Sequence, residues 1–198
     1  MAKSLRTITA VKERPRGRVA VELNGLEWRV FPTEVVVRAG LTSGVELDRV
    51  RLRTLARELR RSKALATAAR ALRHRDLSTR TLGERLSRAG VTSATRAETI
   101  ETLSRAGFLN DERFAVARAR SLVERNMGDA AIRHDLEQHG VDAETAERAF
   151  AEHPPESERV GRVLARRGCS PATARYLARR GFCADVVADA LGEVAPDP

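Results

Sequence analysis

The sequence is poor in aromatic residues and cysteines, and it contains no long apolar run. Aromatic side chains make up only 4% of the 198 residues, against 42% apolar residues in all, which favours many small helices over one thick core. No stretch of about 18 apolar residues occurs, so we expect no membrane span. Residues 1–6 lack the apolar segment of a signal peptide. We therefore expect a cytoplasmic protein whose two cysteines, Cys169 and Cys183, are reduced.

Motifs for catalysis, cofactor binding and metal coordination are also missing. The four histidines are scattered. His134 and His139 stand five residues apart, on different faces of a helix, whereas a helical metal pair would use i, i+4 spacing. The phosphate-binding pattern GxxxxGK followed by Ser or Thr does not occur, nor does the nucleophile pattern GxSxG. We expect no enzyme, no cofactor and no metal site.

Positive charge is concentrated in one segment. The whole chain has a net charge of +9. Residues 49–80 alone hold eleven Lys or Arg against two acidic residues, Glu58 and Asp76, which also makes +9. The rest of the chain therefore sums to about zero. Solvated helix faces usually mix both signs, so this segment indicates a polyanion or an acidic protein surface as partner.

Residues 1–47 have the pattern of a small antiparallel sheet. Residues 6–13, 18–23 and 26–31 read as three strands, rich in β-branched and other apolar residues. Asn24-Gly25 separates the last two runs and suits a two-residue hairpin, because a type I′ turn needs positive φ twice. Pro32 then starts a short helical turn. Three such strands form a small meander, which we expect to pack on the following helix.

The hydrophobic period becomes helical from Asp48 onward. A first apolar stripe consists of Leu52, Leu55, Ala56 and Leu59, with arginines on the opposite face. A second stripe, after Ser62, consists of Leu65, Ala68, Ala69 and Leu72. The second stripe either begins a new helix or continues the first with a shift of face.

Three glycines, Gly90, Gly140 and Gly181, mark an internal repeat. Four residues before them stand Leu86, Leu136 and Leu177. One residue after them stand Val91, Val141 and Phe182. Eleven residues before them stand Thr79, Asp129 and Ser170, which we interpret as helix N-caps. The glycines suit helix C-termini, because glycine adopts the left-handed backbone conformation without a Cβ penalty. Another helix starts after residue 109, with Asn110 or Asp111 as its cap.

Each repeat is thus predicted to contain a helix, a short turn, a second helix, the glycine and a third helix. Units this short bury little apolar area alone, so neighbours should pack end to end. We predict a mainly α fold with a small N-terminal β-meander at residues 1–47. Three three-helix, helix-turn-helix-like modules then follow in an elongated, curved arrangement. They are expected at residues 48–106, where a basic helix is included, 107–153 and 154–198.

Each repeat also carries an arginine fifteen residues before its glycine: Arg75, Arg125 and Arg166. On one interpretation, each is a cation that complements a helix C-terminus, worth about 0.3–1 kcal/mol. On the other, three guanidinium groups form a row that binds a target with its own repeat, such as a phosphate backbone or a helical protein polymer. The two interpretations are compatible. Further electrostatic attachment is expected from Arg57, Arg60, Arg61 and Arg73.

Base-specific reading of DNA has little support. Three-helix units with a sharp turn between their last two helices are similar to helix-turn-helix DNA readers. However, two of the candidate recognition helices start with acidic residues, at 142–145 and 184–186, and these oppose insertion into a DNA groove. Tyr176 is the main candidate for base stacking. Contacts to the nucleic-acid backbone without sequence readout fit better.

Several of these segments together resemble the RecX family of recombination regulators. They are residues 75–78, 82–90 and 128–141, with Gly107-Phe108-Leu109-Asn110-Asp111-Glu112-Arg113-Phe114-Ala115. The match covers about residues 48–194, and residues 31–41 resemble an extension that many members carry. Two positions depart from the family pattern: Thr81 stands where Glu is common, and Asp129 where Pro is frequent.

The resemblance implies a non-enzymatic protein that lies along the groove of the RecA–DNA filament. Family members are understood to bridge recombinase subunits and to suppress strand exchange, ATP hydrolysis and the co-protease activity behind the SOS response. The expected partners are therefore the RecA filament and the backbone of single- or double-stranded DNA, and we expect a monomer. The alternative is a stand-alone helical-repeat protein that binds DNA without sequence preference and without a protein partner.

Overall fold

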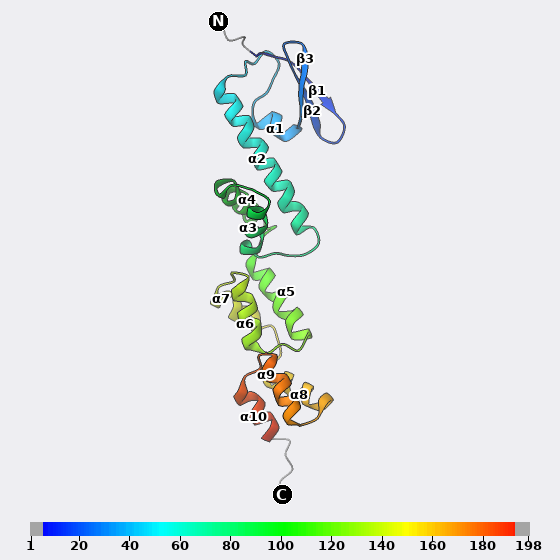
Figure 1. The fold of residues 1–198 in the computed structure, drawn as a ribbon, viewed down its shortest axis with the longest axis vertical. Helices are drawn as coiled ribbons and strands as arrows, with labels where there is room; N and C mark the ends of the chain where they lie inside the picture. Colours follow the sequence, from blue (N-terminus) through cyan, green and yellow to red (C-terminus); the bar gives the residue numbers. More distant parts are fainter. Residues whose placement is uncertain (1–5, 193–198) are drawn as a thin grey trace. The chain divides into compact units, whose positions relative to one another are not determined.

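The computed structural model describes residues 6–192, which form a three-stranded sheet and ten helices (Figure 1). Its contacts divide the chain into two compact units. The first unit combines residues 1–71 with 85–101, and the second combines residues 72–84 with 102–198. The predicted mainly helical fold with a small N-terminal sheet is confirmed. The limits of the single modules and their curved arrangement stay predictions.

The sheet is an antiparallel meander in the order β1-β2-β3, as expected. Its strands are β1 (Ile8–Arg14), β2 (Arg18–Leu23) and β3 (Leu26–Pro32). Asn24 and Gly25 connect β2 to β3 with φ of 49° and 84°, so both turn residues take the left-handed conformation that the Asn-Gly pair predicted. Helix α1 (Thr33–Arg38) follows Pro32, which is its N-cap residue.

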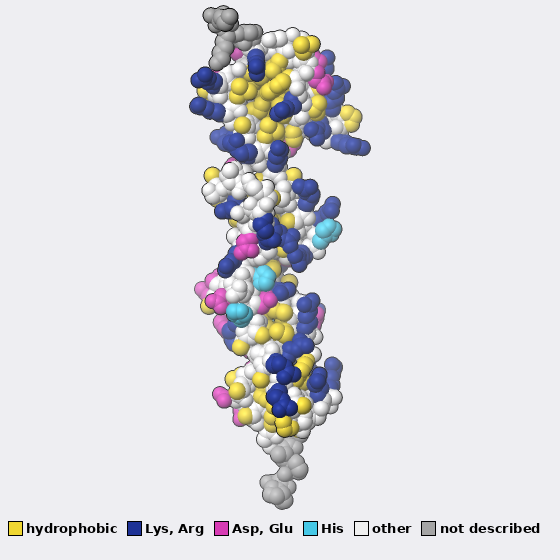
Figure 2. Space-filling model, in the orientation of Figure 1, with side chains coloured by type: hydrophobic (Ala, Val, Ile, Leu, Met, Phe, Trp, Pro, Cys, Tyr) yellow, Lys and Arg dark blue, Asp and Glu magenta, His cyan; other side chains and the backbone are white. Residues whose placement is uncertain are grey.

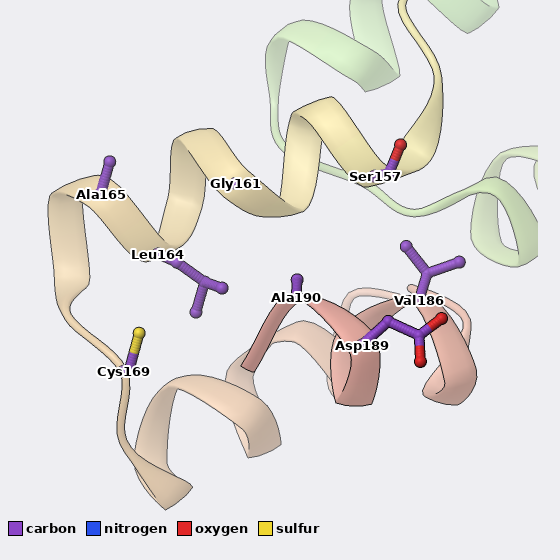
Figure 3. A pocket seen from close by; sticks show the side chains of 8 residues that line it. All are labelled: Ser157, Gly161, Leu164, Ala165, Cys169, Val186, Asp189 and Ala190. Carbon is purple, nitrogen blue, oxygen red and sulfur yellow. The ribbon is translucent and has the colours of Figure 1, made fainter. Parts of the chain in front are cut away.

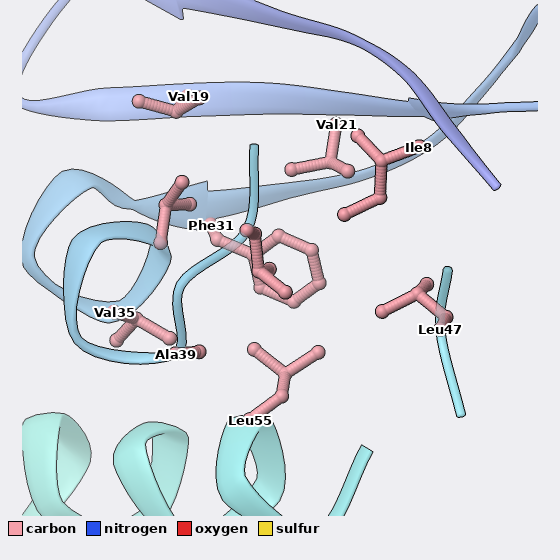
Figure 4. Close-up of a cluster of buried hydrophobic side chains, with 10 residues drawn as sticks. Ile8, Val19, Val21, Phe31, Val35, Ala39, Leu47 and Leu55 are labelled. Atoms are coloured by element: carbon pink, nitrogen blue, oxygen red, sulfur yellow. The ribbon is translucent and has the colours of Figure 1, made fainter. Parts of the chain in front are cut away.

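The core of the first unit lies between this sheet, α1 and the next helix (Figure 4). Ile8, Val21 and Phe31 point inward from the three strands, and all three are almost fully buried. Val35 from α1 and Leu55 from α2 (Arg49–Leu72) close the cluster. The sheet is therefore stabilised by burial against two helices, as three strands of this size require.

Helix α2 resolves the choice that the sequence left open. It continues through Ser62 as one helix of 24 residues, about 36 Å long. The Ser62 hydroxyl donates a hydrogen bond to Oε1 of Glu34 at 2.8 Å, so this serine ties α2 to α1 and does not cap a new helix. The second apolar stripe is thus a continuation of the first.

Eight helices follow α2. They are α3 (Thr79–Arg88), α4 (Ser93–Arg105), α5 (Asp111–Glu124), α6 (Asp129–Gln138), α7 (Ala143–Phe150), α8 (Glu156–Arg167), α9 (Pro171–Arg179) and α10 (Ala184–Gly192). Helices α5–α7, here the second module, share one core around Ile132 and Leu136. Helices α8–α10, here the third module, share another around Val160 and Leu177.

The three anchoring glycines end α3, α6 and α9 in the same way. Their φ angles are 76° at Gly90, 77° at Gly140 and 78° at Gly181. In each case the amide of the next residue donates to the carbonyl of the leucine four residues before the glycine, at 3.0, 3.1 and 3.2 Å. The bond brings the residue after the glycine to the same helix end as the leucine, where helix ends of this type commonly make an apolar side-chain contact.

The predicted N-caps are correct at one helix and wrong at two. Ser170 caps α9 through its side chain, which accepts a hydrogen bond from the Thr173 amide. Thr79 and Asp129 are instead the first residues of their helices. At α3, Ser78 is the residue whose hydroxyl accepts from the Thr81 amide, and at α6 the N-cap residue is Gly128. Relative to its anchoring glycine, α9 therefore starts one residue later than α3 and α6 do.

The first amide of α3 donates to a carboxylate at the start of α5, and the first amide of α6 donates to a carboxylate at the start of α8. Oδ1 of Asp111 accepts from the Thr79 amide at 2.7 Å, and Oε1 of Glu156 accepts from the Asp129 amide at 2.7 Å. Asp111 is the first residue of α5 and Glu156 is the first residue of α8. Asp111 was a possible cap for its own helix, but Asn110 takes that place, through a bond from the Arg113 amide.

Two of the three anchoring glycines, Gly140 and Gly181, also lie at these junctions. A Cβ at Gly140 would be 2.8 Å from the Arg80 side chain at the start of α3. A Cβ at Gly181 would be 2.5 Å from Cβ of Ala131 at the start of α6. Glycine is therefore required twice over, by its backbone angle and by the close approach of the neighbouring helix.

Candidate polyanion-binding surface

Arg75, Arg125 and Arg166 occupy comparable places in the second unit. Arg75 follows α2 in the segment before α3, Arg125 is the C-cap residue of α5, and Arg166 lies in the last turn of α8. All three are exposed. None forms an ion pair or a side-chain hydrogen bond within residues 6–192. The positions of Arg125 and Arg166 also suit the helix dipole, so the two interpretations of these residues remain compatible.

Many other arginines of the second unit are committed to carboxylates. Arg118 donates from Nε and Nη2 to the two oxygens of Asp135, at 2.8 and 2.7 Å. Arg133 donates from Nε to Glu147 at 2.8 Å. These hydrogen bonds hold the pKa of Asp135 and the pKa of Glu147 below their usual values. Further ion pairs with carboxylates involve Arg80, Arg113, Arg120, Arg148 and Arg159, whereas Arg162 approaches Glu158 only to 3.9 Å.

The additional arginines proposed from the sequence differ in how free they are. Arg57 and Arg60 are exposed on α2, and Nε of Arg57 lies 3.2 Å from Oε1 of Glu58. Arg61 is more enclosed and forms an ion pair with Glu98 at 2.9 Å. Arg73 lies just beyond α2, and its Nε donates to the His74 ring at 3.3 Å. Arg60 is therefore the least engaged of the four.

A basic cleft in the second unit was not predicted as a site. It has a volume of about 360 Å³ and lies between the end of α5 and helices α8 and α9. Its cationic lining is Arg159, Arg162, Arg166 and Arg167, with Tyr176 beside them. Sequence reasoning pointed to Arg166 and Tyr176 separately. The i, i+3, i+7 spacing of the first three arginines was the available signal, because such residues share one helix face.

Two other cavities accompany this cleft. One, of about 240 Å³, lies beside Arg75 and is also lined by Arg118 and His139. The larger, of about 490 Å³, lies between α8 and α10. Figure 3 shows the side chains of Leu164 and Ala190 around the apolar part of this larger cavity, with Cys169 at one end.

The described residues offer no group suited to metal chemistry. Within residues 6–192, no cluster of three or more His, Cys, Asp or Glu side chains could hold a metal ion. Cys169 and Cys183 are free and exposed. In the same part of the chain, no helix combines the length and the apolar character needed to cross a bilayer.

Comparisons with known proteins agree on one family. The family model described as "RecX, second three-helix domain" matches residues 110–149. The "Regulatory protein RecX" of two strains of Acidithiobacillus ferrooxidans is 30% identical over 145 residues, covering 67% of this chain and 91% of the relative. A crystal structure of regulatory protein RecX covers 93% of the chain and all of its own, with a TM-score of 0.79 and 19% identity. RecX from Lactobacillus salivarius covers 68% of this chain and 96% of its own, with a TM-score of 0.59 and 18% identity.

Proposed function

Because the chain belongs to the RecX family of regulatory proteins, we propose that it is a non-enzymatic regulator of homologous recombination and the SOS response. In this proposal it binds along the RecA–DNA filament and inhibits the recombinase, ATPase and co-protease activities of the filament. The partners are the RecA filament and the DNA backbone within it. No catalytic residue, cofactor or metal is involved.

The observation that carries this proposal is that Arg75, Arg125 and Arg166 have no side-chain partner among residues 6–192. A guanidinium has five N–H donors, and its bonds to phosphate or carboxylate are charge-assisted. An arginine already bonded to a carboxylate must break that pair before it can bind another anion. These three arginines need no such exchange, and the repeat supplies one of them per module. They are therefore the residues best prepared to bind an external anion that repeats.

The decisive test is charge reversal at these three positions in the full chain. The triple variant Arg75→Glu, Arg125→Glu, Arg166→Glu should lose inhibition of the DNA-dependent ATPase of RecA. Three exposed contacts of about 0.5–1 kcal/mol each correspond to a rise in the inhibitory concentration of at least about tenfold. The measurement is a titration of each variant against preformed filaments.

The matched control reverses three exposed arginines elsewhere. Arg16, Arg29 and Arg38 are exposed in the first unit, lie outside the basic segment 49–80 and form no ion pair within the described residues. The triple Arg16→Glu, Arg29→Glu, Arg38→Glu changes the net charge by the same amount, so it reports the general effect of charge. Inhibition by the first triple that equals wild type, with helicity retained, refutes the role of these arginines. Equal losses of inhibition in both triples would show that inhibition depends on the net charge and not on the positions of these three arginines.

The second candidate function, stand-alone binding of DNA, is favoured by the same charge. It is separated by comparing binding to bare DNA with binding to recombinase-coated DNA over a salt series. Our proposal expects a preference for the coated strand. A steep salt dependence without that preference supports the alternative, because release of counterions is then the main source of affinity.

A further inference from the structure

The basic cleft of the third module has cationic groups that its own carboxylates do not neutralise. Arg162 and Arg166 are four residues apart on α8, so their side chains leave the same face of the helix. The nearest carboxylate to Arg162 is that of Glu158, at 3.9 Å. Glu124 lines the cleft too, but it forms an ion pair with Arg120 at 3.2 Å. Figure 2 shows Lys and Arg side chains among apolar ones over the part of the chain that carries α8 and α9.

The base of the cleft is fixed by a buried arginine. Arg159 is only 4% exposed and forms an ion pair with Asp129. Its Nη1 donates to the Met127 carbonyl at 2.7 Å. Arg159 therefore ties α8 to the second module and is not available to a ligand. The arginines that remain available are Arg162, Arg166 and Arg167. They lie on the same helix, α8, whose position this junction fixes.

Arg167 is held in place without losing its hydrogen-bond donors. Its guanidinium carbon lies 4.1 Å from the centroid of the Tyr176 ring. Arg180 approaches the same ring, at 5.2 Å. A guanidinium stacked on an aromatic face keeps its in-plane N–H groups free, whereas a salt bridge would engage them. Arg167 is thus orientated by α9, and it is exposed.

We propose that this cleft binds one nucleotide of a single-stranded nucleic acid. The phosphate binds Arg162 and Arg166, and the base stacks on Arg167 so that it extends the Tyr176–Arg167 stack. Unpaired bases stack on aromatic rings and on guanidinium planes in this way in single-strand binding proteins. The volume of about 360 Å³ is within the range of small-molecule sites, which begins at roughly 300 Å³.

The stack favours a single strand over other polyanions. In a duplex the base faces are covered by neighbouring bases, so a duplex would use the arginines alone. An acidic peptide would also use only the charges, because its carboxylates have no broad π-face. The proposal therefore predicts that the Tyr176–Arg167 pair matters for single strands and not for the other two ligands.

The test measures fluorescence anisotropy of labelled oligothymidylate and of a labelled duplex with the full chain and no recombinase. Arg167→Lys keeps the charge but removes the planar stack, and should weaken oligothymidylate binding about fivefold or more. Duplex binding should stay within about twofold. Tyr176→Leu should act in the same direction. The double variant Arg162→Gln, Arg166→Gln should lower the salt slope for the single strand by about 0.7, for the one phosphate that both arginines bind.

The control is Arg175→Lys, at an exposed arginine on α9 outside the cleft, which should bind as wild type. Wild-type affinity of Arg167→Lys for oligothymidylate overturns the proposal, as does an equal loss for both DNA forms. Displacement of the oligonucleotide by oligoglutamate of matched charge at equal concentration would assign the cleft to an acidic protein and also overturn it. Arg166 is shared with the filament proposal, but Arg167 and Tyr176 are not. Failure here therefore leaves the filament proposal standing.

Discussion

Truncation of Glu156 should weaken the junction between the second and third modules. The residue is only 9% exposed. It accepts from the Asp129 amide at 2.7 Å and from the Cys183 amide at 3.1 Å, so it joins the starts of α6 and α10. Both amides are among the first donors of their helices, which have no partner inside the helix. One side chain thus satisfies two helix N-termini.

The size of the effect follows from those two bonds. A buried N–H left without a partner costs about 1–3 kcal/mol, so Glu156→Ala could cost about 2–6 kcal/mol. We expect the lower part, about 2–4 kcal/mol, because Cys183 is exposed and water can reach its amide once the side chain is gone. Glu156→Gln should cost less, since its amide oxygen still accepts from one of the two donors.

Urea unfolding followed by circular dichroism measures the change in the free energy of unfolding. Amide exchange at Asp129 and Cys183 measures the loss of protection at the two hydrogen bonds. Glu158→Ala is the control, because Glu158 is exposed on the same helix and approaches Arg162 only to 3.9 Å. The reasoning fails if Glu156→Ala unfolds at the same urea concentration as Glu158→Ala and leaves the exchange of both amides unchanged.

Three further predictions concern the second unit. Gly181→Ala should lower the free energy of unfolding by more than about 2 kcal/mol, because φ is 78° and the new Cβ would lie 2.5 Å from that of Ala131. Gly161→Ala, inside α8 with open space around it, should raise that energy by about 0.5–1 kcal/mol in the same denaturation assay. Because Arg118 lowers the pKa of Asp135 from its usual 3.8, this pair stabilises the fold above that value and loses its effect as the pH falls through the lowered pKa. Asp135→Asn should therefore be less stable than wild type at pH 6, with the difference vanishing in strong acid; a difference that does not change with pH would contradict this.

Local signals in the sequence identified the sheet, the glycine-ended helices and the repeat, but not whether α2 continues through Ser62. Asn24-Gly25 fixed the hairpin, and Gly90, Gly140 and Gly181 fixed three helix ends, because each conformation depends on one or two residues. The roles of Asp111 and Glu156 could not be found in this way. Each caps a helix that starts 32 or 27 residues earlier, and only the fold brings these groups together.

The candidate site, too, could be predicted from the sequence only in part. The repeat identified Arg75, Arg125 and Arg166 by register alone, and the structure adds that they lack carboxylate partners within residues 6–192. Which arginines are engaged depends on carboxylates from other helices, such as Asp135 beside Arg118. The cleft around Tyr176 likewise requires two helices and the end of a third, so no single stretch of sequence contains it.

Pro171 has a consequence for the repeated junction. Thr79 and Asp129 are the first residues of α3 and α6. Their backbone amides donate hydrogen bonds to the carboxylates of Asp111 and Glu156, respectively. The first residue of α9 is Pro171, which has no N–H to present. The bond that joins the start of α3 to α5 and the start of α6 to α8 therefore has no counterpart at α9. Replacing this proline with a serine would supply the missing donor.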